Sequence, residues 1–338
     1  RQRQMCIRDR DIVILRLLAI IIVVFFHAYG MTYANHLPES VATIYRSKYE
    51  LFNQSYLINI AMPMFVVISG YLFGRQLDRK KYDSFWMMAW HKFKRLMIPF
   101  FVFTILFMVT TNNLSYEPFY RWTYWHLWYL PMLFLCFIIS YLFKTIIFFR
   151  ARIGKILLLL VLFVLSLVGK FMPMILGLHN VSLWLCWFVL GMVVYQYYNE
   201  VFEAIHRYHL LWALVVIYIL TGIMYYTEYG EHTVCGTLAS LSGIFIIWYI
   251  CKQIPFHKFR LTNLLIRLSA CSFGIYIFHN WVELYMLSST AQHVFPLADW
   301  AEAHIYLFPF AFATIAFIIS YFISHAIMKF RIGRALIG

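Results

Sequence analysis

Two ionisable side chains, Arg16 and His27, lie within one apolar segment of the chain, residues 11–33. Eleven residues separate them, which on an α-helix is within about 20° of three full turns, so both project from one face, roughly 16 Å apart along the axis. An ionisable group in hydrocarbon costs about 2.5–3.5 kcal/mol even on lenient scales, which makes each a functional candidate. Histidine can accept a proton near neutral pH, and arginine can bind phosphate or stabilise developing negative charge. The structural alternative is that Arg16 extends to the membrane surface and His27 hydrogen-bonds a neighbouring helix.

A second pair of ionisable residues, His279 and Glu283, lies in the apolar segment 267–288. Four residues separate them, so they share one face of a helix, whereas Asn280 adjoins His279 but faces elsewhere. The spacing fits a structural pair within the membrane, and it fits a role in binding a substrate.

Polar residues in two further segments are weaker candidates. His126 and Trp128 begin an apolar segment at its aromatic end, where they either contact a substrate or anchor the helix at the membrane surface. Ser69 and Gly70 favour close helix packing over nucleophilic catalysis, because small residues allow helices to approach in a bilayer. No G-x-S-x-G motif supports a serine nucleophile.

The composition identifies the class of protein. Of the 338 residues, 63% are hydrophobic, 20% are aromatic and only 12% are charged, whereas soluble domains carry about 25% charged residues. Too few polar groups remain to cover a soluble fold, and the same values exclude a disordered chain, a collagen-like repeat and a disulfide scaffold. We expect a polytopic membrane protein embedded in the lipid bilayer.

Ten apolar segments approach the length that a helix needs to cross a hydrocarbon core of about 30 Å. The sequence therefore predicts an all-α transmembrane bundle, with spans near residues 11–33, 55–74, 95–111, 127–144, 155–175, 181–198, 209–227, 234–251, 267–288 and 304–328.

The charges predict the orientation of this bundle. Loops on one side carry 23 lysines and arginines, and the opposite loops carry only Arg46, Lys48 and Arg121. Since positive residues are retained inside, both termini are expected in the cytoplasm. The net charge of +14 is then a consequence of topology, and we expect no nucleic-acid partner.

A basic cluster of Lys92, Lys94 and Arg95 precedes one predicted span. It either serves the topology alone or binds phosphate groups at the cytoplasmic surface. The six cysteines include no C-x-x-C pair, and we expect neither a disulfide nor a metal site.

The first residues, RQRQMCIRDR, resemble translated adapter sequence. We expect residues 1–8 to be non-native or disordered, and residues 9–335 to form a single membrane domain. The apolar run from Ile12 lacks the small-residue cleavage site of a signal peptide.

Five segments, in order, resemble motifs of acyltransferase family 3, the membrane O-acyltransferases of bacterial polysaccharides. Residues 16–27 resemble the R-x10-H first helix, and residues 65–73 (FVVISGYLF) resemble the second helix of the FFVISGYLI type. Residues 91–99 (HKFKRLMIP) are similar to a basic stretch ending in (K/R)RLxxP, residues 126–131 (HLWYLP) to HLW(F/Y)L, and residues 272–279 (SFGIYIFH) to SYGIYLFH.

The resemblance implies an enzyme of the bacterial cytoplasmic membrane that transfers an acyl group, usually acetyl from acetyl-CoA, to a carbohydrate or glycolipid hydroxyl. Acyl-CoA would be a co-substrate, and no bound cofactor is expected. His27 would act as general base, and Arg16 would bind the donor or polarise its carbonyl. The basic cluster would contact CoA, and the candidates for contacting or supporting the acceptor are Ser69, His126, Trp128, His279 and Glu283.

One position departs from the family pattern. Many members carry an acid three residues before the arginine, where this chain has Val13, and Asp11 stands two residues earlier. A different class remains as the alternative: a transporter or flippase of a polysaccharide intermediate, using the same polar face as a passage. The lack of a convincing internal repeat favours the enzyme. The sequence leaves the acceptor, the choice between acetyl and succinyl, and the oligomeric state open.

Overall fold

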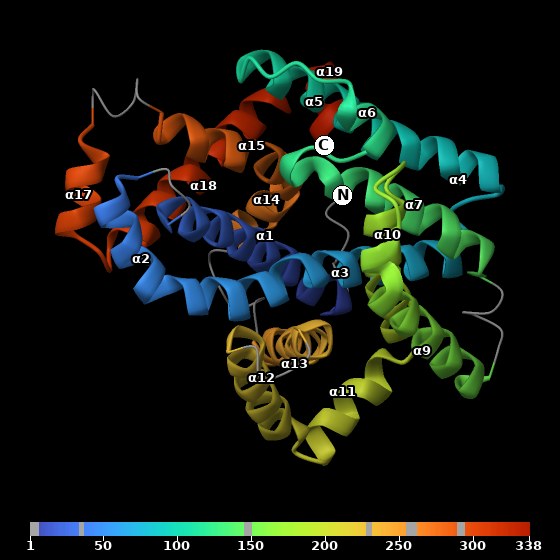
Figure 1. The fold of residues 1–338 in the computed structure, drawn as a ribbon. Coiled ribbons are helices and arrows are strands. Elements are labelled where there is room, and N and C mark those ends of the chain that lie inside the picture. The colour runs from blue at the N-terminus through green and yellow to red at the C-terminus, as the bar shows by residue number, and fades with distance from the viewer. Residues whose placement is uncertain (1–6, 34–36, 145–150, 228–231, 255–261, 289–294) are drawn as a thin grey trace. The chain divides into compact units, whose positions relative to one another are not determined.

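The fold is entirely helical in the part of the chain that the computed structural model describes, residues 7–33, 37–144, 151–227, 232–254, 262–288 and 295–338. The predicted fold class is confirmed to that extent, and most of residues 1–8 lie outside these ranges. The chain divides into two compact units, unit 1 comprising Arg1–Met64 with His206–Gly338 and unit 2 comprising Phe65–Ile205. Figure 1 labels the helices along the chain.

Unit 1 is organised around its first helix, α1 (Ile7–Tyr33), which packs against α2, α13, α14, α15 and α18. Apolar side chains along α1, including Leu15, Ala19 and Val24, are fully buried. Because α1 is a core helix, its polar side chains must be satisfied by other parts of the protein or by a ligand. The other helices of this unit are α2 (Glu39–Leu51), the π-helix η1 (Phe52–Leu57), α12 (Leu210–Tyr226), α13 (His232–Gln253), α14 (Thr262–Ala270), α15 (Ser272–Met286), α17 (Leu297–Ala303), α18 (Phe308–Ile327) and α19 (Arg331–Ile337).

Two helices pass from one unit into the other, α3 (Ile58–Asp78) and α11 (Tyr198–Arg207). Unit 2 further contains α4 (Phe85–Lys92), the π-helix η2 (Phe93–Met97), α5 (Ile98–Thr110), α6 (Glu117–Arg121), the 3-10 helix η3 (Trp125–Trp128), α7 (Tyr129–Leu142), α9 (Arg152–Val168), the 3-10 helix η4 (Gly169–Phe171) and α10 (Leu178–Gln196).

Helices α3 and α10 of unit 2 touch through glycines. A Cβ atom added to Gly70 would lie 1.9 Å from the carbonyl oxygen of Phe188, and one added to Gly191 would lie 2.0 Å from that of Val67. Close backbone contact therefore requires glycine on both helices. This is the packing role that the sequence predicts for Gly70.

The helix predicted from residue 95 begins ten residues earlier. Ser84 caps α4 by accepting a hydrogen bond from the backbone N–H of Met87 at 3.2 Å, and helical structure then continues through η2 and α5 to Thr110. Proline normally interrupts a helix because it has no N–H to donate and clashes with the preceding turn. Pro99 is the second residue of α5 and lies just after η2, a π-helix in which each backbone hydrogen bond spans one more residue than in an α-helix. The chain stays helical across Pro99.

Seven helical stretches of the described residues are long and apolar enough to cross a membrane, or eight if the bent pair α11 and α12 counts as one. They cover seven of the ten predicted spans. The spans predicted near 155–175 and 209–227 correspond to α9 and α12, of 17 residues each, and the span near 267–288 is divided into α14 and α15 at Cys271. The count of ten and the location of the termini remain predictions.

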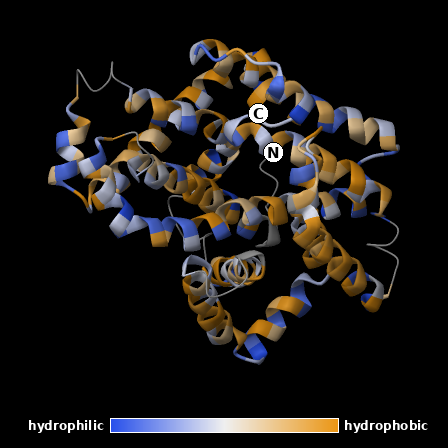
Figure 2. Ribbon diagram, in the orientation of Figure 1, coloured by the Kyte–Doolittle hydropathy of each residue, from blue (hydrophilic) through white to orange (hydrophobic). Residues whose placement is uncertain are grey.

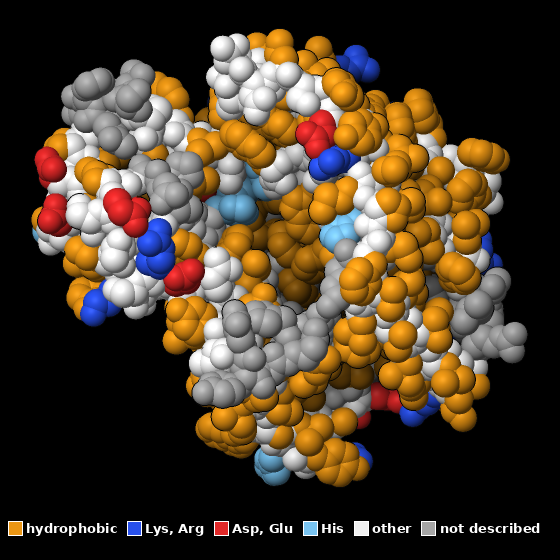
Figure 3. Space-filling view, viewed as in Figure 1, with side chains coloured by type: hydrophobic (Ala, Val, Ile, Leu, Met, Phe, Trp, Pro, Cys, Tyr) orange, Lys and Arg blue, Asp and Glu red, His pale blue; other side chains and the backbone are white. Residues whose placement is uncertain are grey.

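The surface is apolar along these helices. Figure 2 shows hydrophobic residues along most of the helices and hydrophilic residues concentrated toward their ends. On α9 the exposed side chains include Ile153, Ile156, Leu157, Leu160, Val161 and Val164. Figure 3 shows apolar side chains covering the face of unit 2 around α9 and α10. Side chains of this kind suit contact with lipid.

Candidate active site

A single unbroken helix, α1, carries both residues of the predicted polar face in unit 1. Arg16 and His27 are half-buried on it, eleven residues apart. Asp11, the acid nearest to the departure at Val13, is also on α1 and is 4% exposed. The helix geometry that the sequence predicts for this segment is therefore present.

The imidazole of His27 lies against α15, which packs on α1. The ring of His279 is 5.0 Å from the ring of His27, centroid to centroid, with 55° between their planes. The side-chain nitrogen Nδ2 of Asn280 is 3.4 Å from Nδ1 of His27. Three polar side chains from two helices thus meet at one point in unit 1.

The orientation of His279 fixes its tautomer. Its Nδ1 lies 2.7 Å from the carbonyl oxygen of Tyr276 and 3.2 Å from that of Ile275. A carbonyl oxygen only accepts hydrogen bonds, so Nδ1 carries a proton, and in the neutral ring Nε2 then holds the lone pair. His279 is fully buried, with no exposed surface.

Glu283 is fully buried one turn after His279 on α15. Neither of its carboxylate oxygens has a hydrogen-bond partner among the residues that the structure describes. No hydrogen bond therefore joins the Glu283 carboxylate to His279, and the two interpretations of their spacing stay predictions. Burying an ionised carboxylate without a partner costs free energy, so a hydrogen-bond donor would stabilise the Glu283 side chain.

A polar cluster at the end of α1, six residues after His27, was not predicted from the sequence. The hydroxyl of Tyr33 accepts hydrogen bonds from the amides of Asn53, at 2.8 Å, and Gln54, at 2.9 Å. Both amides belong to η1, and π-helical turns are frequent at functional sites. The polar run Asn53-Gln54-Ser55 ahead of an apolar segment is the signal that could have drawn attention to it.

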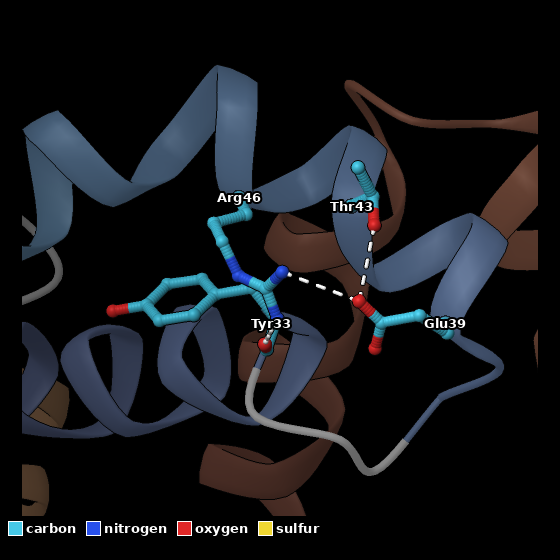
Figure 4. Close-up of polar contacts among 4 residues, drawn as sticks. All are labelled: Tyr33, Glu39, Thr43 and Arg46. Atoms are coloured by element: carbon cyan, nitrogen blue, oxygen red, sulfur yellow. Dashed lines mark hydrogen bonds and ion pairs between the residues drawn. The ribbon is translucent and has the colours of Figure 1, made fainter.

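The same tyrosine is held through its backbone (Figure 4). Arg46 donates a hydrogen bond of 3.1 Å to the carbonyl oxygen of Tyr33, and its other guanidinium nitrogen lies 3.3 Å from Glu39. Thr43 also donates to the Glu39 carboxylate. Arg46 therefore satisfies a terminal carbonyl of α1 and joins that end of the helix to α2.

The remaining acceptor candidates lie in unit 2. The hydroxyl of Ser69 is 3.3 Å from that of Tyr129, and the half-buried Trp128 packs against Trp184, with ring centroids 5.6 Å apart. His126 is 5% exposed, and its ring lies 5.8 Å from that of Phe107. His126 is thus part of the packed interior of its unit, and its role as an acceptor contact or an anchor at the membrane surface stays a prediction.

The basic cluster of unit 2 divides into a buried lysine and two exposed cations. Lys92 is 6% exposed, and its Nζ lies 3.2 Å from Oε1 of Gln76 and 3.6 Å from the centre of the Phe137 ring. Tyr82 donates a hydrogen bond of 2.7 Å to the same Gln76 oxygen. Burial raises the pKa of Tyr82, and the nearby charge of Arg95 opposes that rise.

Lys94 and Arg95 remain exposed. They are therefore better placed than Lys92 to meet a phosphate arriving from solvent. In the described ranges, no three histidine, cysteine or carboxylate side chains come together as a metal site would require.

The sequence model of the acyltransferase domain family matches residues 9–329, nearly the whole chain. The chain belongs to acyltransferase family 3. A search among curated proteins and one among solved structures find no match. Together with the apolar helices, the family identifies a membrane acyltransferase.

In this acyltransferase, sequence reasoning located His27 and His279 but gave Asn280 no role. Adjacent residues of a helix point about 100° apart, and for that reason Asn280 appeared to face away from the site. Two side chains 100° apart can nevertheless reach different atoms of one ring on a facing helix, as His279 and Asn280 do around His27.

Proposed function

We propose that this membrane acyltransferase moves an acetyl group from acetyl-CoA to a hydroxyl of a cell-surface carbohydrate or glycolipid at the bacterial cytoplasmic membrane. The observation that carries the proposal is the position of His27. It lies on a core helix of an acyltransferase family 3 chain, with two polar side chains of α15 around its ring.

The chemistry follows from the weak nucleophilicity of an alcohol. His27 takes the hydroxyl proton as the oxygen attacks the thioester carbonyl carbon, so that a C–O bond forms. The C–S bond then breaks, and the proton passes from the imidazolium to the departing thiolate, which leaves as CoA. Atoms and charge balance without any further reactant.

Arg16 suits the donor better than the reacting carbonyl. It lies roughly 16 Å along the helix axis from His27, whereas an oxyanion requires donors at about 3 Å. The extended pantetheine arm of CoA separates the thioester from the phosphates, so a guanidinium at this distance from the base fits a phosphate group. Lys94 and Arg95 are the further candidates for contact with CoA.

The test is acetylation of the host glycans by the full-length chain. Cells expressing the protein should yield surface glycans whose mass increases by one acetyl group in place of a hydrogen. His27→Ala should abolish that increase, since general base catalysis contributes about 10²–10⁴ in rate. His325→Ala, which changes an exposed histidine of α18, is the matched control and should retain it.

The same variants separate an enzyme from a transporter. His27→Ala should leave export of the glycan intact. Lost export with unchanged acetylation in this variant would overturn the proposal and support the passage of a polysaccharide intermediate instead.

A further inference from the structure

Asn280 lies where it can control the protonation of His27. Asn280 is 6% exposed, and its side-chain nitrogen Nδ2 lies 3.4 Å from Nδ1 of His27. Asn280 follows His279 directly on α15. Nδ1 of His279 is hydrogen-bonded to backbone carbonyl oxygens of the same helix. On α15, Asn280 thus contacts a nitrogen of the His27 ring, and the ring of His279 lies beside that ring with the centroids 5.0 Å apart.

The nitrogen that an amide contacts decides which nitrogen can act as base. A neutral imidazole carries one proton, so a partner at Nδ1 that accepts a hydrogen bond keeps the proton there and leaves Nε2 with its lone pair. A partner that donates to Nδ1 has the reverse effect. Asparagine has both capacities, because a half-turn about χ2 exchanges its oxygen and its NH2 group.

We propose that Asn280 is the positioning residue of His27: with its oxygen toward Nδ1, it holds the ring in the tautomer whose Nε2 takes the acceptor's proton. The same contact stabilises the imidazolium that forms, as the orienting group does in hydrolytic triads. With its NH2 toward Nδ1, the orientation in this structure, it holds the ring in the other tautomer, which does not act as base at Nε2. A half-turn of the amide about χ2 then brings the ring into the tautomer that acts as base. This inference rests on the proposed function of His27.

The experiment compares two substitutions of similar size. Asn280→Asp keeps an acceptor at Nδ1, and Asn280→Leu removes every polar atom. Full-length variants in native membranes are supplied with radiolabelled acetyl-CoA, and the host glycans in those membranes serve as acceptor.

Asn280→Leu should lower kcat about 10- to 100-fold. The KM for acetyl-CoA should stay within about twofold, because binding of acetyl-CoA does not depend on which nitrogen of His27 carries the proton. Asn280→Asp should retain a kcat well above that of Asn280→Leu. Asn59→Leu is the matched control: Asn59 is also a buried asparagine of unit 1, but its amide donates to the Ser55 carbonyl. Asn59→Leu should keep the wild-type kcat. For every variant, kcat is calculated per folded molecule, and size-exclusion chromatography measures the amount of folded protein.

Wild-type kcat in Asn280→Leu, or equal losses in the Leu and Asp variants, would overturn the inference. If Asn280→Asp does not fold, the split between kcat and KM in Asn280→Leu decides alone. His27→Ala is measured in the same series. Wild-type activity of His27→Ala would contradict the proposed function. An inactive His27→Ala together with an Asn280→Leu variant of wild-type activity would contradict only the role of Asn280.

Discussion

At His27, the neighbouring side chains determine what the imidazole can do. Half-buried on a core helix, the ring contacts His279 on one side and Asn280 at Nδ1. An imidazole held in this way loses rotational freedom before a substrate arrives, and that pre-organisation is what a catalytic base requires. The chemistry proposed for the protein depends on this local arrangement more than on any other.

Glu283 gives a prediction at the same scale. Because its buried carboxylate has no hydrogen-bond partner among the described residues, Glu283→Gln removes the cost of an ionisable group and should keep the stability of the fold or raise it by up to about 3 kcal/mol. The unfolding temperature in detergent, measured for this variant and for the exposed control Glu302→Gln, checks the prediction. A large loss of stability would indicate an ionic partner that the carboxylate requires.

At the scale of elements, the contact between α3 and α10 depends on two missing side chains. Gly70 and Gly191 bring the helix backbones into direct contact, each against a carbonyl oxygen of the other helix. Backbone atoms cannot move aside as the end of a flexible side chain can, so a methyl group at either position forces the helices apart.

Gly70→Ala should therefore destabilise the protein by roughly 1–3 kcal/mol. Gly74→Ala, one turn further along α3, is the matched control, since its added Cβ would lie 3.4 Å from the nearest atoms, at ordinary contact distance. Thermal unfolding of both variants, followed by size-exclusion chromatography, measures the difference. Equal midpoints would contradict the packing role of Gly70.

The features that could be predicted from the sequence depend on local periodicity, whereas most of the features that were missed depend on contacts between separate segments. Long apolar runs predicted the helices, and eleven-residue spacing predicted that Arg16 and His27 share α1, because both depend only on local periodicity. The ten helical residues before residue 95 were missed, since a π-turn close to a proline has no simple sequence signature. The contacts of Asn280 and the Tyr33 cluster were missed because they join segments far apart in the chain.

At the scale of the whole molecule, charge asymmetry is the main information on orientation. Without the arginines of the first ten residues, 19 basic residues still fall on one predicted side against three on the other. Since basic loops stay in the cytoplasm, the loop between α3 and α4 is expected inside and α17 outside.

This orientation predicts the result of cysteine labelling in intact cells. Lys81→Cys should be protected from an impermeant maleimide until the membrane is opened, whereas Glu302→Cys should react at once; both positions are exposed. The five described native cysteines are buried, so the unmodified chain provides the background. Immediate labelling at position 81 together with protection at position 302 would show that the orientation in the membrane is the reverse of the predicted one.

The most direct test of the central claim supplies labelled acetyl-CoA on one side of a membrane. The purified protein, in vesicles that carry host glycolipid, should transfer labelled acetyl to a glycan hydroxyl, and His27→Ala should not, although it inserts and folds as the wild type does. Transfer at the wild-type rate by His27→Ala would contradict the assignment of His27 as the catalytic base.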